Sequence, residues 1–171
     1  MISLQPELIN LLQLAYSAER AASFAYKGHA GAVNVLEDKT RIKEIENDEW
    51  QHRAEVLRIM QEYEVRVSAY YEIKYYLIGK IICYSCYVIG WFMPMYFAGR
   101  LESGNVSEYF NMKELFNQLN ITRHDAILIE MGMKEKEHEV FFLSKIRSHK
   151  WLPLFEKVFS WGNNKSLNSI Q

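Results

Sequence analysis

Hydrophobic residues recur every three or four positions over four long stretches of the chain, which is the period of an amphipathic α-helix. This pattern predicts four long helices, over residues 6–27, 38–63, 72–103 and 125–146. Two short helices are expected in addition, over residues 107–120 and 152–161. No stretch alternates between apolar and polar residues as a half-buried strand would. The sequence therefore predicts an all-α fold, a bundle of four long helices with one or two short extra ones.

Each of the four predicted helices carries a carboxylate within its apolar stripe. Glu19, for example, lies at the same helical spacing as Leu12 and Ala22. In the second and fourth helices the glutamate is followed three residues later by a histidine, so both side chains project from one helix face. The inward polar residues are, in chain order, Glu19, Glu49, His52, Glu102, Glu135 and His138.

Four carboxylates that face one another in an apolar interior cannot all be ionised unless a cation compensates their charge. Two divalent metal ions would supply four positive charges against four negative ones, and the two imidazoles would complete the ligand set. Oxygen and nitrogen ligands without thiolate favour iron, with manganese as the alternative, over a structural zinc site. Two lone glutamates with two Glu-x-x-His pairs on four helices form the ligand pattern of di-iron and di-manganese bundle proteins.

Any one of these six residues, taken alone, is more often a core or surface residue than a metal ligand. Their joint occurrence on four helices favours the metal site. Other acids compete for the same role, and a shift of one helical turn would exchange Glu135 for Glu130. The histidine at position 138 favours Glu135. Asp48 and Tyr26 are candidates for residues that contact the metal ligands and orient them. The other interpretation of Asp48 is a solvated carboxylate at the surface.

The third predicted helix is the most hydrophobic, because nineteen consecutive uncharged residues separate Lys80 from Arg100. Such a run is long enough to cross a bilayer. However, Pro94 interrupts it, and Glu102 near its end must lie inside the protein. The favoured interpretation is a buried bundle helix that is kinked at Pro94. Peripheral contact with a membrane and a homodimer interface are the other interpretations of this apolar segment.

The charge balance excludes one broad class of function. The chain has 20 Lys and Arg against 21 Asp and Glu, so no basic face for nucleic acid is expected. Cys83 and Cys86 are too few for a secreted disulfide scaffold and are interpreted as buried free thiols. His29 and His124, near helix ends, are expected to be solvated. The length fits one domain over residues 1–162, followed by a flexible polar tail over 163–171.

The order Glu, Glu-x-x-His, Glu, Glu-x-x-His resembles the ligand pattern of the ferritin-like di-iron carboxylate superfamily, and most closely the demethoxyubiquinone hydroxylase family. The spacing is also similar, with thirty residues from Glu19 to Glu49 and thirty-three from Glu102 to Glu135. The segment from Glu19 to His29 looks like the first helix of that family, and residues 65–68 are similar to its crossover. The resemblance covers roughly residues 8–143.

This resemblance implies a ferritin-like bundle with a crossover, in which the six inward residues bind two iron ions. It implies a di-iron oxidoreductase, an O₂-dependent monooxygenase that hydroxylates a small hydrophobic quinone-like or aromatic substrate. Electrons would come from NADH or a reductase. A cytoplasmic protein is expected, peripheral to the inner membrane if it contacts lipid, and a homodimer. The family usually has histidines shortly after the third glutamate, where residues 103–107 of this chain have none.

That departure leaves the delivery of electrons open. The alternative function is a ferritin-like iron-handling or peroxide-scavenging protein. A bundle with a vestigial or purely structural metal site is the third possibility.

Overall fold

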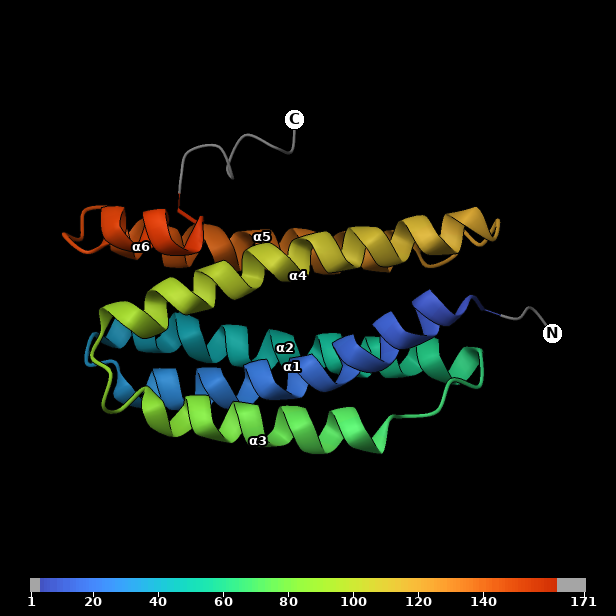
Figure 1. Cartoon of the computed structure of the whole chain (residues 1–171), viewed down its shortest axis with the longest axis horizontal. Coiled ribbons are helices and arrows are strands. Elements are labelled where there is room, and N and C mark those ends of the chain that lie inside the picture. Colours follow the sequence, from blue (N-terminus) through green and yellow to red (C-terminus); the bar gives the residue numbers. More distant parts are fainter. Residues whose placement is uncertain (1–3, 163–171) are drawn as a thin grey trace.

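The computed structural model describes residues 4–162, and within this range the chain forms helices joined by short connections, with no strand (Figure 1). The all-α prediction is therefore confirmed. The predicted tail over residues 163–171 lies outside the described residues. The structure has six helices in the described range, namely α1 (Pro6–Ala32), α2 (Leu36–Glu62), α3 (Ala69–Ser85), α4 (Phe92–Gln118), α5 (Asp125–Ile146) and α6 (Leu152–Phe159).

The four long helices form two antiparallel pairs, with α1 packed against α2 and α4 against α5. The helices α2 and α4 run in the same direction, because α3 carries the chain back between them (Figure 1). The core consists of two apolar clusters. On each of the four helices, one cluster lies before the inward glutamate in the sequence and the other lies after it. The inward polar residues therefore occupy a layer between two apolar regions.

The prediction of one helix over residues 72–103 is wrong. The helix α3 ends at Ser85 and α4 begins at Phe92. Between them the chain turns at Gly90, whose φ of 80° lies in the left-handed region that favours glycine. Pro94 lies in the first turn of α4, where its missing N–H removes no helical hydrogen bond. The separate short helix expected over residues 107–120 is instead the second half of α4.

The helix α3 lies outside the bundle and packs closely on α1 (Figure 1). Two glycines permit this approach. A Cβ atom at Gly28 of α1 would lie 2.2 Å from the carbonyl oxygen of Cys83, and one at Gly79 of α3 would lie 2.7 Å from the Cα atom of Ala21. Both distances are shorter than any real Cβ contact, so the two backbones can pack at this spacing only because these side chains are absent.

The expectation that the apolar segment 81–99 is buried on every side is wrong for its first part. Gly79 is the one buried residue of α3. Large apolar side chains of α3 and the following turn are exposed, among them Tyr70, Ile73, Leu77, Ile81, Tyr84, Tyr87 and Val88. We call this surface the outer face of α3. Among the described residues, no helix has the length and hydropathy needed to cross a bilayer.

Candidate metal centre

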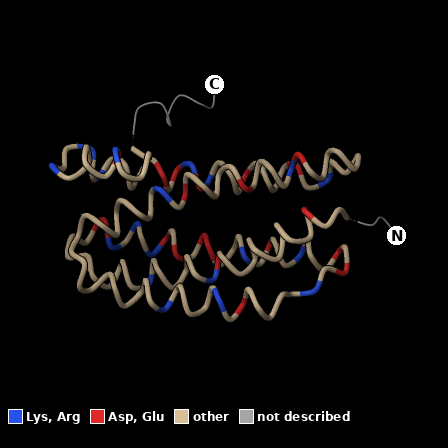
Figure 2. The backbone as a smooth tube through the Cα atoms, in the orientation of Figure 1, with Lys and Arg blue, Asp and Glu red and all other residues tan. Residues whose placement is uncertain are grey.

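The structure brings all six inward residues together in the middle of the bundle, and each is at most 6% exposed. Figure 2 shows acidic positions about midway along both helix pairs. The six residues form two groups, in each of which one ligand atom per residue lies within 4.8 Å of the others. Glu49 and Glu135 belong to both groups. The groups are Glu19, Glu49, His52 and Glu135, and Glu49, Glu102, Glu135 and His138.

The two histidines reach across the bundle in a reciprocal way. His52 of α2 places its Nδ1 atom 2.8 Å from a carboxylate oxygen of Glu135 on α5. His138 of α5 places its Nδ1 atom 3.5 Å from a carboxylate oxygen of Glu49 on α2, and 3.7 Å from one of Glu135. The pair α1 and α2 therefore contributes His52 to a group that contains Glu135 of α5. The pair α4 and α5 contributes His138 to a group that contains Glu49 of α2.

The two lone glutamates are held by tyrosines in the same reciprocal way. The hydroxyl group of Tyr26 on α1 donates a hydrogen bond to Glu102 on α4. The hydroxyl group of Tyr109 on α4 donates one to Glu19 on α1. Each tyrosine follows the glutamate of its own helix by seven residues, which is two helical turns. This i, i+7 spacing is the signal in the sequence that finds Tyr109 as the counterpart of Tyr26.

The ligand atoms themselves are buried without hydrogen-bond partners among residues 4–162. Seven such atoms belong to this site: Glu19 Oε2, both carboxylate oxygens of Glu49 and Glu135, and the Nδ1 atoms of His52 and His138. Buried polar atoms normally have partners, and a concentration of orphaned acceptors requires an explanation such as a bound ion. Carboxylate oxygen and imidazole nitrogen are also the donor types that divalent iron and manganese take. These buried groups could hold a metal ion.

The electrostatics of the site explain why a cation fits it. Burial raises the pKa of Glu19, and it raises the pKa of Glu49 and Glu102 well above the ordinary value; the charge of Glu135 adds to each shift. Burial would also raise the pKa of Glu135, but the side chains of Glu102 and of the two histidines, which lie close to its carboxylate, hold this pKa below its usual range. Without a cation, most of these acids keep their protons at a pH where exposed carboxylates are ionised.

The metal-free protein is therefore expected to lose stability as the pH rises. An acid whose pKa is raised by folding binds more protons in the folded state, so its contribution is complete below its ordinary pKa and is lost as the pH rises through the raised pKa. We expect a lower melting temperature at pH 8 than at pH 5 in the presence of a chelator. Added Mn²⁺ should raise the melting temperature more at pH 8 than at pH 5.

The variant Glu49→Gln provides the control for this pH dependence, since a neutral amide replaces one of the buried acids. Its metal-free form should lose less stability between pH 5 and pH 8 than the wild type does. An equal loss in both proteins would place the effect outside the site.

Asp48 lies behind one of the two histidines. Its Oδ2 atom is 3.0 Å from the Nε2 atom of His138, on the far side of the ring from Glu49. A carboxylate in this place fixes the orientation of the ring and makes its other nitrogen a better ligand. Asp48 therefore lies where a residue that orients a ligand histidine is expected.

The site is not symmetric at His52. Lys134 precedes Glu135, at the position that corresponds to Asp48 before Glu49. His52 instead belongs to the wall of a surface pocket of about 270 Å³, together with Asp48, Glu55, Glu130 and Lys134. The two metal positions would thus differ: one histidine is backed by a carboxylate, and the other borders a pocket with three acids.

Replacing Asp48 by asparagine is expected to weaken metal binding by about 10–100-fold, the usual cost of losing a carboxylate behind a ligand histidine. Titration of the metal-free protein with Mn²⁺ measures this effect. Glu130→Gln is the matched control, because Glu130 lines the same pocket. Equal affinities in the two variants would contradict the role of Asp48.

Several other sequence interpretations are settled by the structure. Glu130, the competitor one turn before, lies outside both ligand groups, as does Glu139, which accepts hydrogen bonds from Lys136 and Trp161. Cys83 and Cys86 are free thiols; Cys86 is buried, and Cys83 is partly exposed.

The expectation that His29 and His124 are solvated is wrong, since both are 2% exposed. Helix α1 continues to Ala32, so His29 is still within the helix and faces the interior.

No protein-family model, no curated protein and no solved structure matches the chain. The buried site and the cavities around it are therefore the features of the molecule from which a function can be inferred.

Proposed function

We propose that this chain is a ferritin-like di-iron protein, an O₂-dependent monooxygenase that hydroxylates a small hydrophobic quinone-like or aromatic substrate. The observation that carries the proposal is the pair of overlapping four-residue groups that share Glu49 and Glu135. The chain path supports it, because α2 and α4 run in the same direction and are joined through α3, as in bundles with one crossover (Figure 1).

Two iron ions bound by the six residues would supply the one-electron redox chemistry that O₂ activation needs. The protein's own contribution is positional. Glu49 and Glu135 would hold both ions, because each belongs to both groups. Tyr26 and Tyr109 fix the two lone glutamates by hydrogen bonds. The apolar clusters on either side of the site keep water away from the reacting centre.

A second candidate function is ferritin-like iron handling or peroxide scavenging. The pocket beside His52 supports it, since three acids around an opening next to a ligand offer a route by which Fe²⁺ could exchange.

Metal analysis and turnover separate the two candidates. Iron and manganese per chain are measured first, and the absorption of the oxidised protein is recorded. The reduced protein is then supplied with O₂ and a soluble quinone analogue, with NADH or with chemical reduction as the electron source. Substrate-dependent O₂ uptake and a hydroxylated product support the monooxygenase. Rapid loss of peroxide without substrate supports the alternative, and a protein that binds no metal excludes both.

The outer face of α3 supports the predictions about partners. Its exposed apolar side chains could pack against a second copy of the chain, which we propose as a homodimer. Peripheral contact with the inner membrane would use the same surface. The cytoplasmic location, and NADH or a reductase as the electron donor, remain part of the same proposal.

A further inference from the structure

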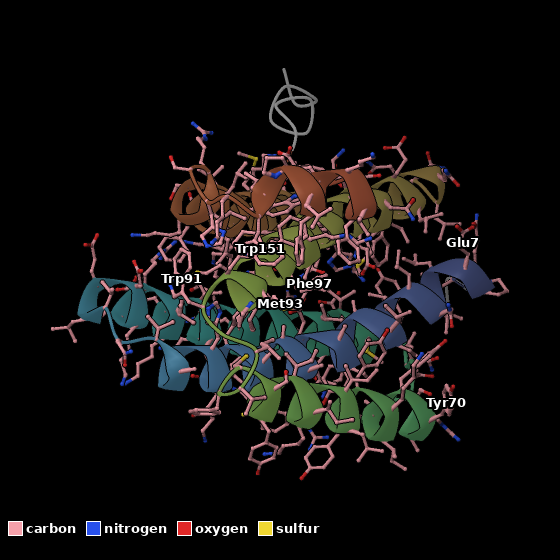
Figure 3. The ribbon with its side chains drawn as sticks, turned by 60° about the vertical axis from the view of Figure 1, so that its left-hand side comes forward. Glu7, Tyr70, Trp91, Met93, Phe97 and Trp151 are labelled. Atoms are coloured by element: carbon pink, nitrogen blue, oxygen red, sulfur yellow. The ribbon has the colours of Figure 1, made fainter. Side chains whose placement is uncertain are left out.

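A cavity of about 360 Å³ lies between α1, the end of α3 and the beginning of α4. Figure 3 shows Met93 and Phe97, two of its wall residues, near the beginning of α4 above the pair formed by α1 and α3. Tyr26 is also part of the wall, and its hydroxyl group donates a hydrogen bond to Glu102. One side chain therefore separates the cavity from a candidate metal ligand.

Most polar groups in this wall are already paired within the protein. The hydroxyl group of Ser85 donates to the carbonyl oxygen of Ile82 at 2.8 Å. The guanidinium group of Arg100 donates through Nε to the carbonyl oxygen of Phe159 at 3.3 Å, and Arg100 is exposed. The remaining wall is largely apolar, with side chains such as Ile89 and Leu101. A molecule in this cavity would be held mainly by apolar contacts.

His29 is the exception. It belongs to the wall, is 2% exposed, and has an Nε2 atom that is buried without a hydrogen-bond partner among the described residues. Its ring stacks on Phe142, with ring centroids 5.8 Å apart and planes 16° apart. Burial lowers the pKa of His29 to about 4, against the opposing effect of the Asp38 charge. The imidazole is therefore neutral at pH 7 and can donate or accept one hydrogen bond.

We propose that this cavity is the substrate site, and that His29 hydrogen-bonds the oxygen of a neutral, otherwise apolar ring compound. That the bound compound is a substrate rests on the proposed function. The volume lies within the range of small-molecule pockets, about 300–1,000 Å³. A neutral imidazole does not compensate the charge of a carboxylate, and the cation of the wall, Arg100, is exposed. A substrate that reaches His29 is therefore uncharged.

Binding to the metal-free protein tests the cavity separately from any catalysis. The probes are duroquinone, a ring with two carbonyl oxygens and four methyl groups, and durene, the same methylated ring without oxygens. We expect duroquinone to bind one site per chain and to bind more tightly than durene. Duroquinone that does not bind, or binds no better than durene, overturns the proposal.

Ser85→Trp should block the cavity from its α3 wall and abolish binding of both probes. Ser144→Trp is the matched control, because the hydroxyl group of Ser144 likewise bonds the carbonyl oxygen three residues before it, and Ser144 lies outside this cavity. The control should bind like the wild type. Unchanged binding in Ser85→Trp places the probe elsewhere and contradicts the assignment.

His29→Phe keeps an aromatic ring against Phe142 but removes the free nitrogen. It should weaken duroquinone binding by about three- to ten-fold, the loss of one hydrogen bond, and leave durene binding unchanged. Equal effects on both probes would mean that His29 only packs. The tetramethylbenzoate anion should bind more weakly than duroquinone; tighter binding that is lost in Arg100→Met would instead identify an anionic ligand.

Metal content, measured in the same samples, separates this inference from the proposed function. Binding of duroquinone without metal would support the cavity as a binding site and contradict the proposed monooxygenase. Binding of metal without duroquinone would contradict the cavity as a binding site and leave the proposed metal centre in place.

Discussion

Replacing Glu49 by alanine is expected to abolish the binding of both metal ions. Glu49 belongs to both four-residue groups, so the variant leaves each group with three ligands. Its carboxylate is fully buried and has no hydrogen-bond partner within the described residues. Removal of this acid also removes the cost of burying a carboxyl group in the bundle interior, so the metal-free variant should melt at the same temperature as the metal-free wild type or higher. Metal analysis after dialysis and thermal melts with and without Mn²⁺ measure both effects.

The thermal measurement distinguishes a lost ligand from a lost fold. A folded Glu49→Ala protein that gains no stability from Mn²⁺ has lost the site alone. His138→Ala should also lose metal, whereas Glu44→Ala, which replaces an exposed residue of α2, should bind it normally. Undiminished metal content in both Glu49→Ala and His138→Ala would remove the assignment of the site.

Gly28→Ala is expected to destabilise the protein by about 2–3 kcal/mol, an overpacking cost, although alanine is the better helix former. The new Cβ atom would lie 2.2 Å from the carbonyl oxygen of Cys83, and a backbone atom cannot move aside as a flexible side chain can. The helices α1 and α3 must therefore separate. Denaturant unfolding measures the free energy, and duroquinone binding should weaken because α3 supplies part of the cavity wall.

Gly104→Ala is the control, since Gly104 also lies within a long helix and has nothing within 4 Å of its Cβ position. There the helix propensity of alanine acts alone and should stabilise the protein by about 0.5–1 kcal/mol. Opposite signs for the two substitutions are the expected result. Stabilisation by Gly28→Ala would show that α1 and α3 are not packed as closely as described.

The helical stripes and the inward residues could be predicted because burial is periodic along a helix. A glutamate interrupts each stripe, and a histidine follows it three residues later in the second and fourth stripes; this histidine selects Glu135 over Glu130. The break between α3 and α4 could not be predicted in the same way, because the apolar run continues through it. Exposed residues of α3 and the following turn, such as Ile81 and Val88, are as hydrophobic as the buried residues of α4. Hydrophobicity alone does not distinguish a helix buried in the core from a helix with an exposed apolar face.

The burial of His29 was missed for a related reason. The glycines at positions 28 and 31 suggest the end of a helix, whereas α1 continues to Ala32 because Gly28 serves the close approach of α3. A glycine required by packing against a distant segment and a glycine that ends a helix look alike in one sequence. The two tyrosines were within reach of the sequence, since their i, i+7 spacing from the lone glutamates repeats on α1 and α4.

The reciprocal arrangement of the ligands has a consequence for how the molecule comes apart. Residues from α1 and α2 alone, or from α4 and α5 alone, complete neither four-residue group. Bound ions would thus link the two helix pairs across the seam where they meet, and without metal the buried acids weaken the packing at this seam. Opening along this seam, seen as faster amide hydrogen exchange next to Glu49 and Glu135 when metal is withheld, should be the first step by which the protein loses its structure.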